Sequence, residues 1–472
     1  MFIGRKEELN VLNNLKQKKS ASLVTITGRR RIGKSRLAEE FGKNYKFYSF
    51  IGMPPNKDTT AEGERKGFAL QLEKYFNVPI RYDNWYILLS FLAKQTIAED
   101  AVILFDEISW MGSRDQQFLG TLKSIWDQEF SKNDKLVMIL CGSISLWIEK
   151  NILSSTGFVG RISLKLDLKE LSLKEAAEFW PVNHTSAHNV LKILSITGGV
   201  PRYLEEIYPN ENAEANIKRL CFDASGILFN EFEQIFSDLF DNKYTIYRDI
   251  VLSLVDGAKT REEISDLTKL PANGVLSDYL ENLEKTNFIS RYYTWNLKTE
   301  KSMRLSQYRL SDNYLRFYLK YIMPNKDQIK KGHFKNIDIY ALPKWFSMMG
   351  MQFENLVIHN RNLIHNILDI SPTIIINDGP YFQQKTKRHS GCQVDYMIQT
   401  KSNELYVIEI KCLRQAVEKS IIQEMKDKIK ALDKPKYYAI RPVLIHINGV
   451  GDSVEEENYF YKLIDFSKLI TL

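Results

Sequence analysis

The chain has 472 residues, of which 44% are hydrophobic and 26% are charged. This composition is typical of a globular protein and excludes a disordered or fibrous chain. Because the length exceeds what one hydrophobic core usually serves, we expect two to four domains. The net charge of +7 is compatible with a nucleic-acid partner but does not identify one.

Location and cysteine use can be predicted from simple patterns. No apolar run approaches the roughly 20 residues that a membrane helix needs, and the first residues, MFIGRKEELN, lack the apolar segment of a signal peptide. We therefore expect a cytoplasmic protein that does not bind a membrane. The four cysteines, Cys141, Cys221, Cys392 and Cys412, lack metal-ligand spacing, so buried reduced thiols are expected.

The first part of the chain, residues 1–170, alternates strand and helix patterns. A strand is predicted at residues 22–27 and a helix from Lys34 to Phe41. Short apolar runs without charge at 102–105 and 136–140 are typical of buried strands in a parallel sheet. The predicted fold class is α/β, with a parallel-sheet P-loop ATPase core in this region.

A phosphate-binding loop connects the first predicted strand and helix. Its residues match G-x-x-x-x-G-K-[ST], in which glycines let backbone amides surround phosphates, the lysine meets the β- and γ-phosphates, and the hydroxyl ligates Mg²⁺. The positive end of the helix macrodipole adds to this anion site. The candidate nucleotide-binding residues are Gly28, Arg29, Arg30, Arg31, Ile32, Gly33, Lys34, Ser35 and Arg36.

An acidic pair follows the buried run VILF. Asp106, at the end of that predicted strand, can hold the water shell of Mg²⁺, and Glu107 can orient and deprotonate the attacking water. The alternative is a chance turn with a surface acidic pair, which the joint spacing of the two motifs disfavours. We therefore expect ATP and Mg²⁺ as cofactors, with Ser35 and Asp106 as metal ligands.

Five segments, FIGRKEEL, GRRRIGKS, ILFDEISW, ILCGS and GGVPRYL, resemble the archaeal-type ATPases of the STAND branch of AAA-related proteins, over residues 1 to about 210. The resemblance implies that Ile3 to Arg5 border the adenine, that Ser143 takes the sensor position and that Pro201 reaches the base from a lid. It also implies that Arg161 touches a γ-phosphate, in its own subunit or a neighbouring one. A surface arginine is the alternative, and a homo-oligomer or a protein partner stays open.

The middle of the chain predicts a helical lid at 171–240 and a winged helix-turn-helix at 241–323, followed by a polar linker at 324–339. Val275, Leu276, Tyr279, Leu280 and Leu283 are expected on the buried face of the second helix of the helix-turn-helix. Its outer face is acidic, which favours an interdomain or regulatory role over base readout. Basic residues in and after the wing could meet a nucleic-acid backbone or form a solvated hairpin: Arg291, Lys298, Lys301, Arg304, Arg309 and Arg316.

The last region, residues 340–472, contains the segment GCQVDYMIQTKSNELYVIEIKC. Asp395 is expected on one strand, and Glu409 and Lys411 on one face of the next. Asp395 and Glu409 could bind Mg²⁺, and Lys411 could position or activate a water that attacks a phosphodiester. The alternative is an exposed ion pair on a strand.

This spacing resembles the PD-(D/E)XK nuclease superfamily, and Glu354 resembles the glutamate that this family carries upstream. The resemblance implies a C-terminal α/β restriction-endonuclease-like domain, in the order ATPase, winged helix and nuclease-like domain that archaeal-type ATPases frequently show. The expected function is an ATP-binding and hydrolysing switch that controls Mg²⁺-dependent cleavage of DNA. The alternative is a regulatory STAND-type scaffold that binds DNA or protein and carries a catalytically silent nuclease-like domain.

Overall fold

The computed structural model describes residues 2–54, 58–142, 145–181, 186–240, 243–387 and 390–470, with backbone only at 145 and 146. The chain forms two compact units, one that ends at Glu170 and one that begins at Leu171. Each unit has its own hydrophobic core.

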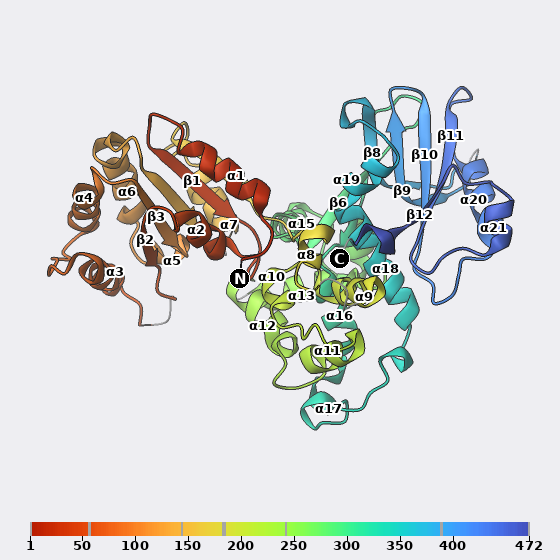
Figure 1. The fold of residues 1–472 in the computed structure, drawn as a ribbon, viewed down its shortest axis with the longest axis horizontal. Coiled ribbons are helices and arrows are strands. Elements are labelled where there is room, and N and C mark those ends of the chain that lie inside the picture. The colour runs from red at the N-terminus through yellow and green to blue at the C-terminus, as the bar shows by residue number, and fades with distance from the viewer. Residues whose placement is uncertain are drawn as a thin grey trace. The chain divides into compact units, whose positions relative to one another are not determined.

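The N-terminal unit is built on a five-stranded parallel sheet with the strand order β2-β3-β4-β1-β5 (Figure 1). The strands are β1 (Ser22–Thr27), β2 (Lys46–Ile51), β3 (Ala101–Asp106), β4 (Val137–Cys141) and β5 (Ile162–Asp167). The helices are α1 (Lys6–Leu15), α2 (Lys34–Gly42), α3 (Ala61–Phe76), α4 (Trp85–Thr96), α5 (Ile108–Met111), α6 (Gln117–Gln128), η1 (Phe130–Lys132), α7 (Ser145–Ile148) and η2 (Glu149–Leu153).

Both faces of this sheet are covered by helices. Alternate residues of the central strands, such as Ile103 and Phe105, pack with α3, α4 and α6, whereas Val102 and Leu104 pack with α1 and α2. Because both faces are buried, the strands read as continuous apolar runs, as a parallel sheet requires. The α/β class and the parallel sheet predicted for this region are confirmed.

The second unit begins with helices. They are α8 (Leu173–Ala177), α9 (Ala187–Thr197), α10 (Pro201–Leu204), α11 (Ala213–Cys221) and α12 (Ile227–Phe240). Three further helices and a hairpin follow, in the order expected for a winged helix: α13 (Tyr244–Ser253), α14 (Arg261–Thr268), α15 (Gly274–Lys285), β6 (Ile289–Trp295) and β7 (Ser302–Leu310). The backbone groups of Lys259 and Tyr308 exchange two hydrogen bonds, which tie the loop before α14 to β7.

Helix α15 buries Leu276, Tyr279, Leu280 and Leu283 against the core, as its apolar spacing predicts. Val275, expected on the same face, is instead 53% exposed. It lies in the first helical turn and is rotated by about 100° from Leu276, which places it at the edge of the apolar stripe.

The polar segment expected to be a linker packs against the unit. The expected linker, residues 324–339, contains α17 (Lys326–Lys330), and η5 (Met323–Asn325) and η6 (Ile339–Ala341) overlap its two ends. The elements α16 (Asn313–Phe317) and η4 (Tyr318–Ile322) precede it. Ile329 and Ile339 are buried in the core that the preceding helices share. Two apolar anchors therefore hold this stretch in place, although most of its residues are polar.

The C-terminal sheet has the strand order β12-β11-β10-β9-β8 (Figure 1). Strands β8, β9 and β10 pair antiparallel, and β10, β11 and β12 pair parallel. The elements are α18 (Trp345–His359), α19 (Arg361–Ile367), η7 (Pro372–Ile374), β8 (Ile375–Gln383), β9 (Cys392–Thr400), β10 (Glu404–Lys411), α20 (Ser420–Ala431), β11 (Ala439–His446), α21 (Asp452–Glu456), β12 (Lys462–Asp465) and η8 (Phe466–Leu469).

The β6–β7 hairpin is docked on this sheet. Trp295 and Leu297 at its tip belong to the hydrophobic core on one face of the sheet, and Trp295 packs edge to face on Tyr381. The Thr294 hydroxyl donates a hydrogen bond of 2.6 Å to the carbonyl of Phe382. The hairpin and the C-terminal sheet are therefore one packed structure.

Candidate functional site

The loop between β1 and α2 has a backbone that phosphate groups can enter. Gly28, Arg31 and Gly33 all have positive φ, at 136°, 68° and 91°. A Cβ on Gly28 would lie 2.6 Å from the carbonyl oxygen of Leu168, so no other residue fits there without movement. The loop leads directly into the first turn of α2, where free backbone amides and the helix dipole favour an anion.

Lys34 and Ser35 open the helix on the side of this loop. The Lys34 ammonium donates hydrogen bonds to the carbonyls of Gly28 and Arg29, at 2.9 and 3.0 Å. Burial lowers the pKa of Lys34, although the negative charges of Glu107 and Asp106 act to raise it. The ammonium group of Lys34 is thus bonded to the carbonyls of its own loop, and it would have to turn away from them to reach a phosphate.

The expected magnesium ligands lie together. The Ser35 hydroxyl donates a hydrogen bond of 2.6 Å to Asp106 Oδ2. Ser35 lies in the first turn of α2, after β1, whereas Asp106 lies at the end of β3. Asp106 Oδ1 accepts the backbone N–H of Glu107 at 3.0 Å. A hydroxyl and a carboxylate at this separation fit a magnesium ion that keeps most of its water shell.

Glu107 is the N-cap residue directly before α5 and has a φ of 48°, so its backbone turns sharply away from β3. A Cβ on Gly142, directly after β4, would lie 3.9 Å from Glu107 Oε2. Strand β4 lies between β1 and β3, so its end adjoins both the loop and the acidic pair. Ser143, expected at the sensor position after β4, lies outside the described residues.

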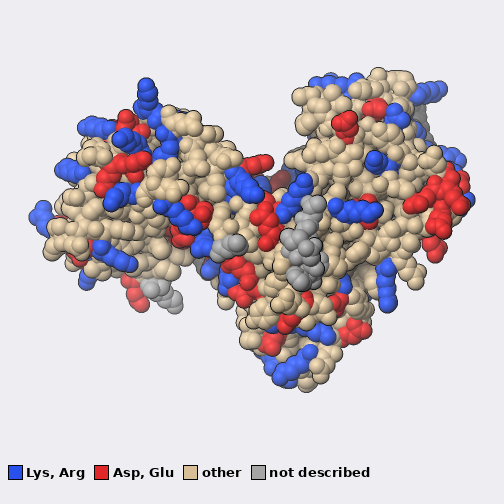
Figure 2. All heavy atoms as spheres, viewed as in Figure 1, with Lys and Arg blue, Asp and Glu red and all other residues tan. Residues whose placement is uncertain are grey.

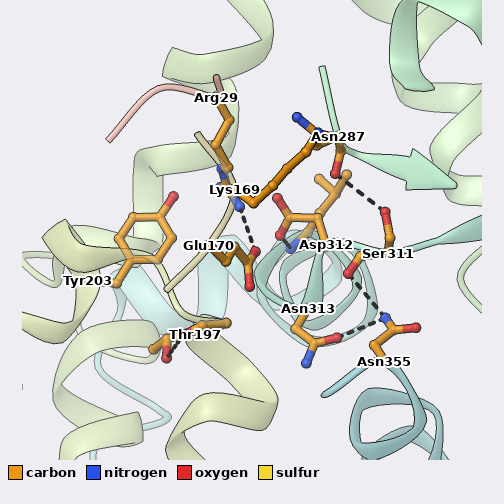
Figure 3. Close-up of polar contacts among 12 residues, drawn as sticks. Arg29, Lys169, Glu170, Thr197, Tyr203, Asn287, Ser311, Asp312, Asn313 and Asn355 are labelled. Carbon is orange, nitrogen blue, oxygen red and sulfur yellow. Dashed lines mark hydrogen bonds and ion pairs between the residues drawn. The ribbon is translucent and has the colours of Figure 1, made fainter. Parts of the chain in front are cut away.

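The remaining residues of the loop have varied surroundings. Arg29 is buried, with Nη1 3.6 Å from Glu170 Oε1 (Figure 3). Arg30 and Arg31 are partly buried, and Ile32 is fully buried in the core beneath α1 and α2. Arg36 is exposed, with Nη1 3.8 Å from Glu39 Oε2.

The segment expected to border the adenine is tied to the loop. Arg5 donates hydrogen bonds to the carbonyls of Ile32, at 3.2 Å, and of Lys169, at 2.6 Å. Ile3 is partly buried next to it. Pro201, expected to reach the base, is the first residue of α10 in the second unit.

Arg161 forms a two-point ion pair with Asp127 at the surface of the N-terminal unit. The Nε and Nη2 atoms lie 2.6 and 2.8 Å from the two carboxylate oxygens. The hydrogen bond from Arg161 lowers the pKa of Asp127. This geometry matches the alternative of a surface arginine, and a role at a phosphate would require the pair to separate.

In the second unit, Asp395, Glu409 and Lys411 come together at one end of β9 and β10. The antiparallel register pairs Ile408 with Tyr396, and its continuation sets Asp395 opposite Glu409, so both side chains share a face. Asp395 Oδ2 accepts the backbone N–H of Ile410 at 2.9 Å. Lys411 Nζ lies 3.1 Å from Glu409 Oε1.

The carboxyl of Asp395 has a raised pKa. Burial is the main cause, followed by the negative charges of Glu409 and Glu354. Raised pKa values in crowded, buried carboxylates are typical of functional sites. Asp395 and Glu409 therefore place two carboxyl groups side by side, an arrangement that can ligate a divalent cation.

Lys428 of α20 is a member of this site that sequence reasoning missed. Its Nζ lies 2.5 Å from Glu409 Oε2. Burial opposes the charge of Lys428, but Asp395 and Glu409 outweigh it and raise the pKa. The spacing along α20 could have indicated that Lys428 faces the sheet, because Lys428 lies on the same helical face as the buried Ile421 and Met425.

Glu354 on α18 is also paired with a cation. Its Oε2 lies 2.8 Å from Nη1 of Arg309, which comes from strand β7. Arg309 and Arg316 are almost fully buried, so neither alternative expected for the basic residues in and after the wing, contact with a nucleic-acid backbone or a solvated hairpin, applies to these two. Both guanidinium groups find hydrogen-bond acceptors inside the protein: Arg309 donates to Asn355 and Met351 of α18, and Arg316 donates to Gln352 of α18 and to the Leu310 carbonyl of β7.

The other basic residues of the hairpin differ in exposure. Lys298 is paired with Asp433 of the C-terminal sheet domain, and Arg291 donates a hydrogen bond to the Ser306 hydroxyl. Lys301 and Arg304 are exposed. On the face shown in Figure 2, basic side chains are interspersed with acidic ones among the described residues.

The described residues contain neither a cluster of metal-ligating side chains nor a membrane-spanning helix. Within the described ranges, no group of three or more histidine, cysteine, aspartate and glutamate side chains is arranged to hold a metal ion. A cation at Asp395 and Glu409 would therefore need water or backbone oxygens as further ligands. In the same part of the chain, no helix has the length and apolar character required to cross a membrane.

Comparisons with known proteins identify the N-terminal region. Residues 2–207 match the family model described as an ATPase domain predominantly from Archaea. An uncharacterized protein of Methanocaldococcus jannaschii is 26% identical over 99% of this chain and 100% of its own length. An uncharacterized ATP-binding protein of the same organism is 44% identical over 10% of this chain and 78% of its own length.

A solved structure shares the fold. The Walker-type ATPase of Pyrococcus abyssi superposes with a TM-score of 0.50 and 18% identity, over 67% of this chain and 96% of its own. The parallel sheet, the phosphate-binding loop and the family match agree with one another. Residues 2–207 are therefore an archaeal-type P-loop ATPase domain, which implies that the chain binds nucleotide.

Proposed function

We propose that the chain is an ATP-binding and hydrolysing switch that controls a Mg²⁺-dependent DNA endonuclease activity of its C-terminal domain. The observation that carries this proposal is the meeting of Asp395, Glu409 and Lys411 at one end of β9 and β10, in a chain that also contains an ATPase domain. The domains proposed are the ATPase core to residue 170, a lid at 171–240, a winged helix at 241–323 and a nuclease-like domain from 340.

In the ATPase half, the backbone from Gly28 to Gly33 binds the phosphates, and Lys34 turns from the loop carbonyls toward them. Ser35 and Asp106 would hold Mg²⁺, and the ion would neutralise the charge that develops on the phosphates. Glu107 orients the attacking water and accepts its proton. The resemblance adds Ser143, Pro201 and Ile3 to Arg5 at the sensor and base positions.

In the nuclease-like half, Asp395 and Glu409 hold the cation, and Lys411 donates a hydrogen bond to the attacking water or to a phosphate oxygen. Mg²⁺ supplies charge neutralisation at the scissile phosphate. Glu354 adds a further polar group to the proposed site, because its charge acts on Asp395. The burial of Asp395 and Glu409 strengthens the attraction for a cation.

One observation favours the second candidate, a regulatory scaffold whose nuclease-like domain is silent. Glu409 is paired with two lysines and Glu354 with an arginine, so two of the three carboxylates already have protein counter-ions. Such pairing can stabilise a fold after catalysis is lost.

Cleavage of plasmid DNA separates the two candidates. The proposal expects nicking or linearisation that requires Mg²⁺ and is abolished in Asp395→Ala and Glu409→Ala. Glu418→Ala, at an exposed carboxylate just before α20, is the control and should cleave like the wild type. If the wild type shows no cleavage that depends on Asp395 and Glu409, either with or without ATP, the nuclease proposal is rejected and the regulatory scaffold is the remaining candidate.

The ATPase half has a separate test. Lys34→Ala is expected to lose ATP binding, whereas Glu107→Gln retains binding and loses hydrolysis. ATP binding is measured by equilibrium titration and hydrolysis by phosphate release. Unchanged turnover in Glu107→Gln would reject the assignment of the general base.

A further inference from the structure

Three segments of the chain meet at the end of the C-terminal sheet where β10 and β11 begin. Because these strands are parallel neighbours (Figure 1), the chain enters both of them at the same end. The Tyr438 hydroxyl, in the loop before β11, donates a hydrogen bond of 2.8 Å to Glu300 Oε1 at the tip of the β6–β7 hairpin. The backbone N–H of Ala439 donates to the carbonyl of Asn403, in the turn before β10, at 2.8 Å. We call the surface formed by residues 296–301, 401–403 and 433–438 the tip surface.

The tip surface carries an excess of positive charge. Its lysines are Lys298, Lys301, Lys401, Lys434 and Lys436, and its acidic residues are Glu300 and Asp433. Lys298 pairs with Asp433. The ammonium groups of Lys401 and Lys434 donate hydrogen bonds to neutral carbonyls, so they keep their net charge. Lys301 and Lys436 are exposed, and among the described residues neither forms an ion pair. Charge complementarity therefore favours a polyanionic partner.

Tyr437 is exposed among these lysines. It is 69% exposed, more than any other large hydrophobic residue in the described part of the chain. The next residue, Tyr438, is buried, and its hydroxyl accepts a hydrogen bond of 3.0 Å from the Gln399 amide. Pro435 is buried as well, so anchors on both sides fix the backbone from which Tyr437 projects. A fixed, exposed aromatic ring in a basic surface is typical of proteins that stack unpaired bases.

We propose that the tip surface binds a single-stranded segment of DNA, with Lys301 and Lys436 at backbone phosphates and Tyr437 stacked on a base. A single strand fits this surface better than a duplex, because the bases of a duplex are already stacked on one another and leave no face for Tyr437. The inference rests on the proposed function in taking DNA as the partner. It deepens that function by naming the form of DNA that is bound and the residues that hold it.

The tip surface is separate from the candidate cation site. Glu404, the first residue of β10, and Glu409 are five residues apart on that strand, which corresponds to about 17 Å at the rise of a β-strand. A strand of DNA bound at the tip surface is therefore held away from the carboxylates. Substitutions at the tip surface also leave Asp395, Glu409 and Lys411 in place, so binding and cleavage can be tested separately.

The test is the binding of the nucleotide-free full chain to a fluorescently labelled oligothymidine, measured by fluorescence anisotropy in EDTA and repeated at several salt concentrations. A duplex of the same length is the second probe. Because no divalent cation is present, binding is measured independently of cleavage. One variant combines Lys301→Gln with Lys436→Gln. The others are Tyr437→Leu, which removes the ring, and Tyr437→Phe, which retains it.

Matched controls come from exposed positions of the N-terminal unit. Lys18→Gln combined with Lys19→Gln removes the same charge from two exposed lysines, neither of which forms an ion pair within the described ranges. Tyr86→Leu removes a ring from α4 at a position that is 51% exposed. Both controls should bind oligothymidine within about twofold of the wild type, because charges outside the binding surface are largely screened by salt. Thermal unfolding of each variant checks that the chain is folded.

The proposal expects the double lysine variant at the tip surface to bind oligothymidine about five- to tenfold more weakly than the wild type. The slope of its salt dependence should fall by about 1.4, as expected for the loss of two phosphate contacts on a single strand. Tyr437→Leu should bind at least about fivefold more weakly with an unchanged slope, since stacking releases no counterions. Tyr437→Phe should bind like the wild type, and Tyr437→Leu should leave the binding of the duplex unchanged.

Three results would overturn the proposal: no binding of oligothymidine by the wild type, equal losses in the two double lysine variants, or unchanged binding by Tyr437→Leu. The second would show that only net charge matters, and the third would remove the reason for a single strand. Failure of the proposed function gives a different result. A wild type that binds oligothymidine through these residues but cleaves no plasmid loses the nuclease site and keeps the tip surface.

Discussion

At the residue scale, the phosphate-binding loop depends on Gly28 for steric reasons. Its φ of 136° is in the region that L side chains rarely adopt, and the space beside it is filled by the Leu168 carbonyl. The spacing of GRRRIGKS predicts this loop from sequence because the backbone geometry itself demands glycine there. The contact with Leu168 could not be predicted, since it depends on how the chain returns after β5.

Gly28→Ala is therefore expected to destabilise the protein by about 1–3 kcal/mol and to abolish measurable ATP binding. Gly120→Ala is the matched control, because Gly120 is an exposed position inside α6 with nothing within 4 Å of an added Cβ. It should raise stability by roughly 0.5–1 kcal/mol through helix propensity and leave ATP binding unchanged. Chemical denaturation and ATP titration measure the two effects, and equal losses in both variants would contradict the steric argument.

The ion pair of Arg161 and Asp127 makes a prediction about pH. Because Arg161 lowers the pKa of Asp127, the pair contributes stability above the ordinary pKa of an aspartate, and this contribution is lost as the pH falls through the lowered value. The stability of Arg161→Ala should thus be slightly below that of the wild type at neutral pH and equal to it in acid.

ATP turnover of the same variant separates the two roles of Arg161. A surface ion pair predicts turnover within about twofold of the wild type, as for most exposed pairs. A loss of turnover that depends on protein concentration would instead indicate that Arg161 acts on the γ-phosphate of a neighbouring subunit.

At the element scale, helices and strands with strong periodicity could be predicted, whereas their packing partners could not. The strands at 101–106 and 137–141 lie within a residue of the predicted runs, because apolar stretches buried on both faces leave a clear pattern. The basic residues of the β6–β7 hairpin were predicted either to be solvated or to meet a nucleic-acid backbone. Trp295 and Leu297 at its tip instead enter the core of a sheet far along the sequence, which no local pattern records.

Leu297→Ala tests whether the hairpin tip is part of that core. Leu297 is 2% exposed, and its truncation should lower the free energy of unfolding by about 2–5 kcal/mol. Leu267→Ala, at a 58% exposed position of α14, is the matched control and should change stability by less than about 0.5 kcal/mol. Thermal and chemical unfolding measure the stability of both variants. An equal loss of stability in Leu297→Ala and Leu267→Ala would contradict the docking of the hairpin tip in the core.

At the scale of the whole molecule, the candidate nuclease-like site combines what the sequence could and could not predict. Asp395, Glu409 and Lys411 could be predicted because alternation along two adjacent strands places them on one face. Lys428 and Arg309 come from α20 and β7, and only the folded chain shows that they neutralise Glu409 and Glu354. The result is a buried acidic site whose charge is balanced by elements outside the motif.

The central claim is that the ATPase domain controls the nuclease-like domain. The most direct measurement is the rate of Mg²⁺-dependent plasmid cleavage with and without ATP, in the wild type, Lys34→Ala and Asp395→Asn. Control by ATP should give cleavage that requires Asp395, a rate that changes several-fold when ATP is added, and no such change in Lys34→Ala. Cleavage that is absent, independent of Asp395, or equally fast with and without ATP would contradict it.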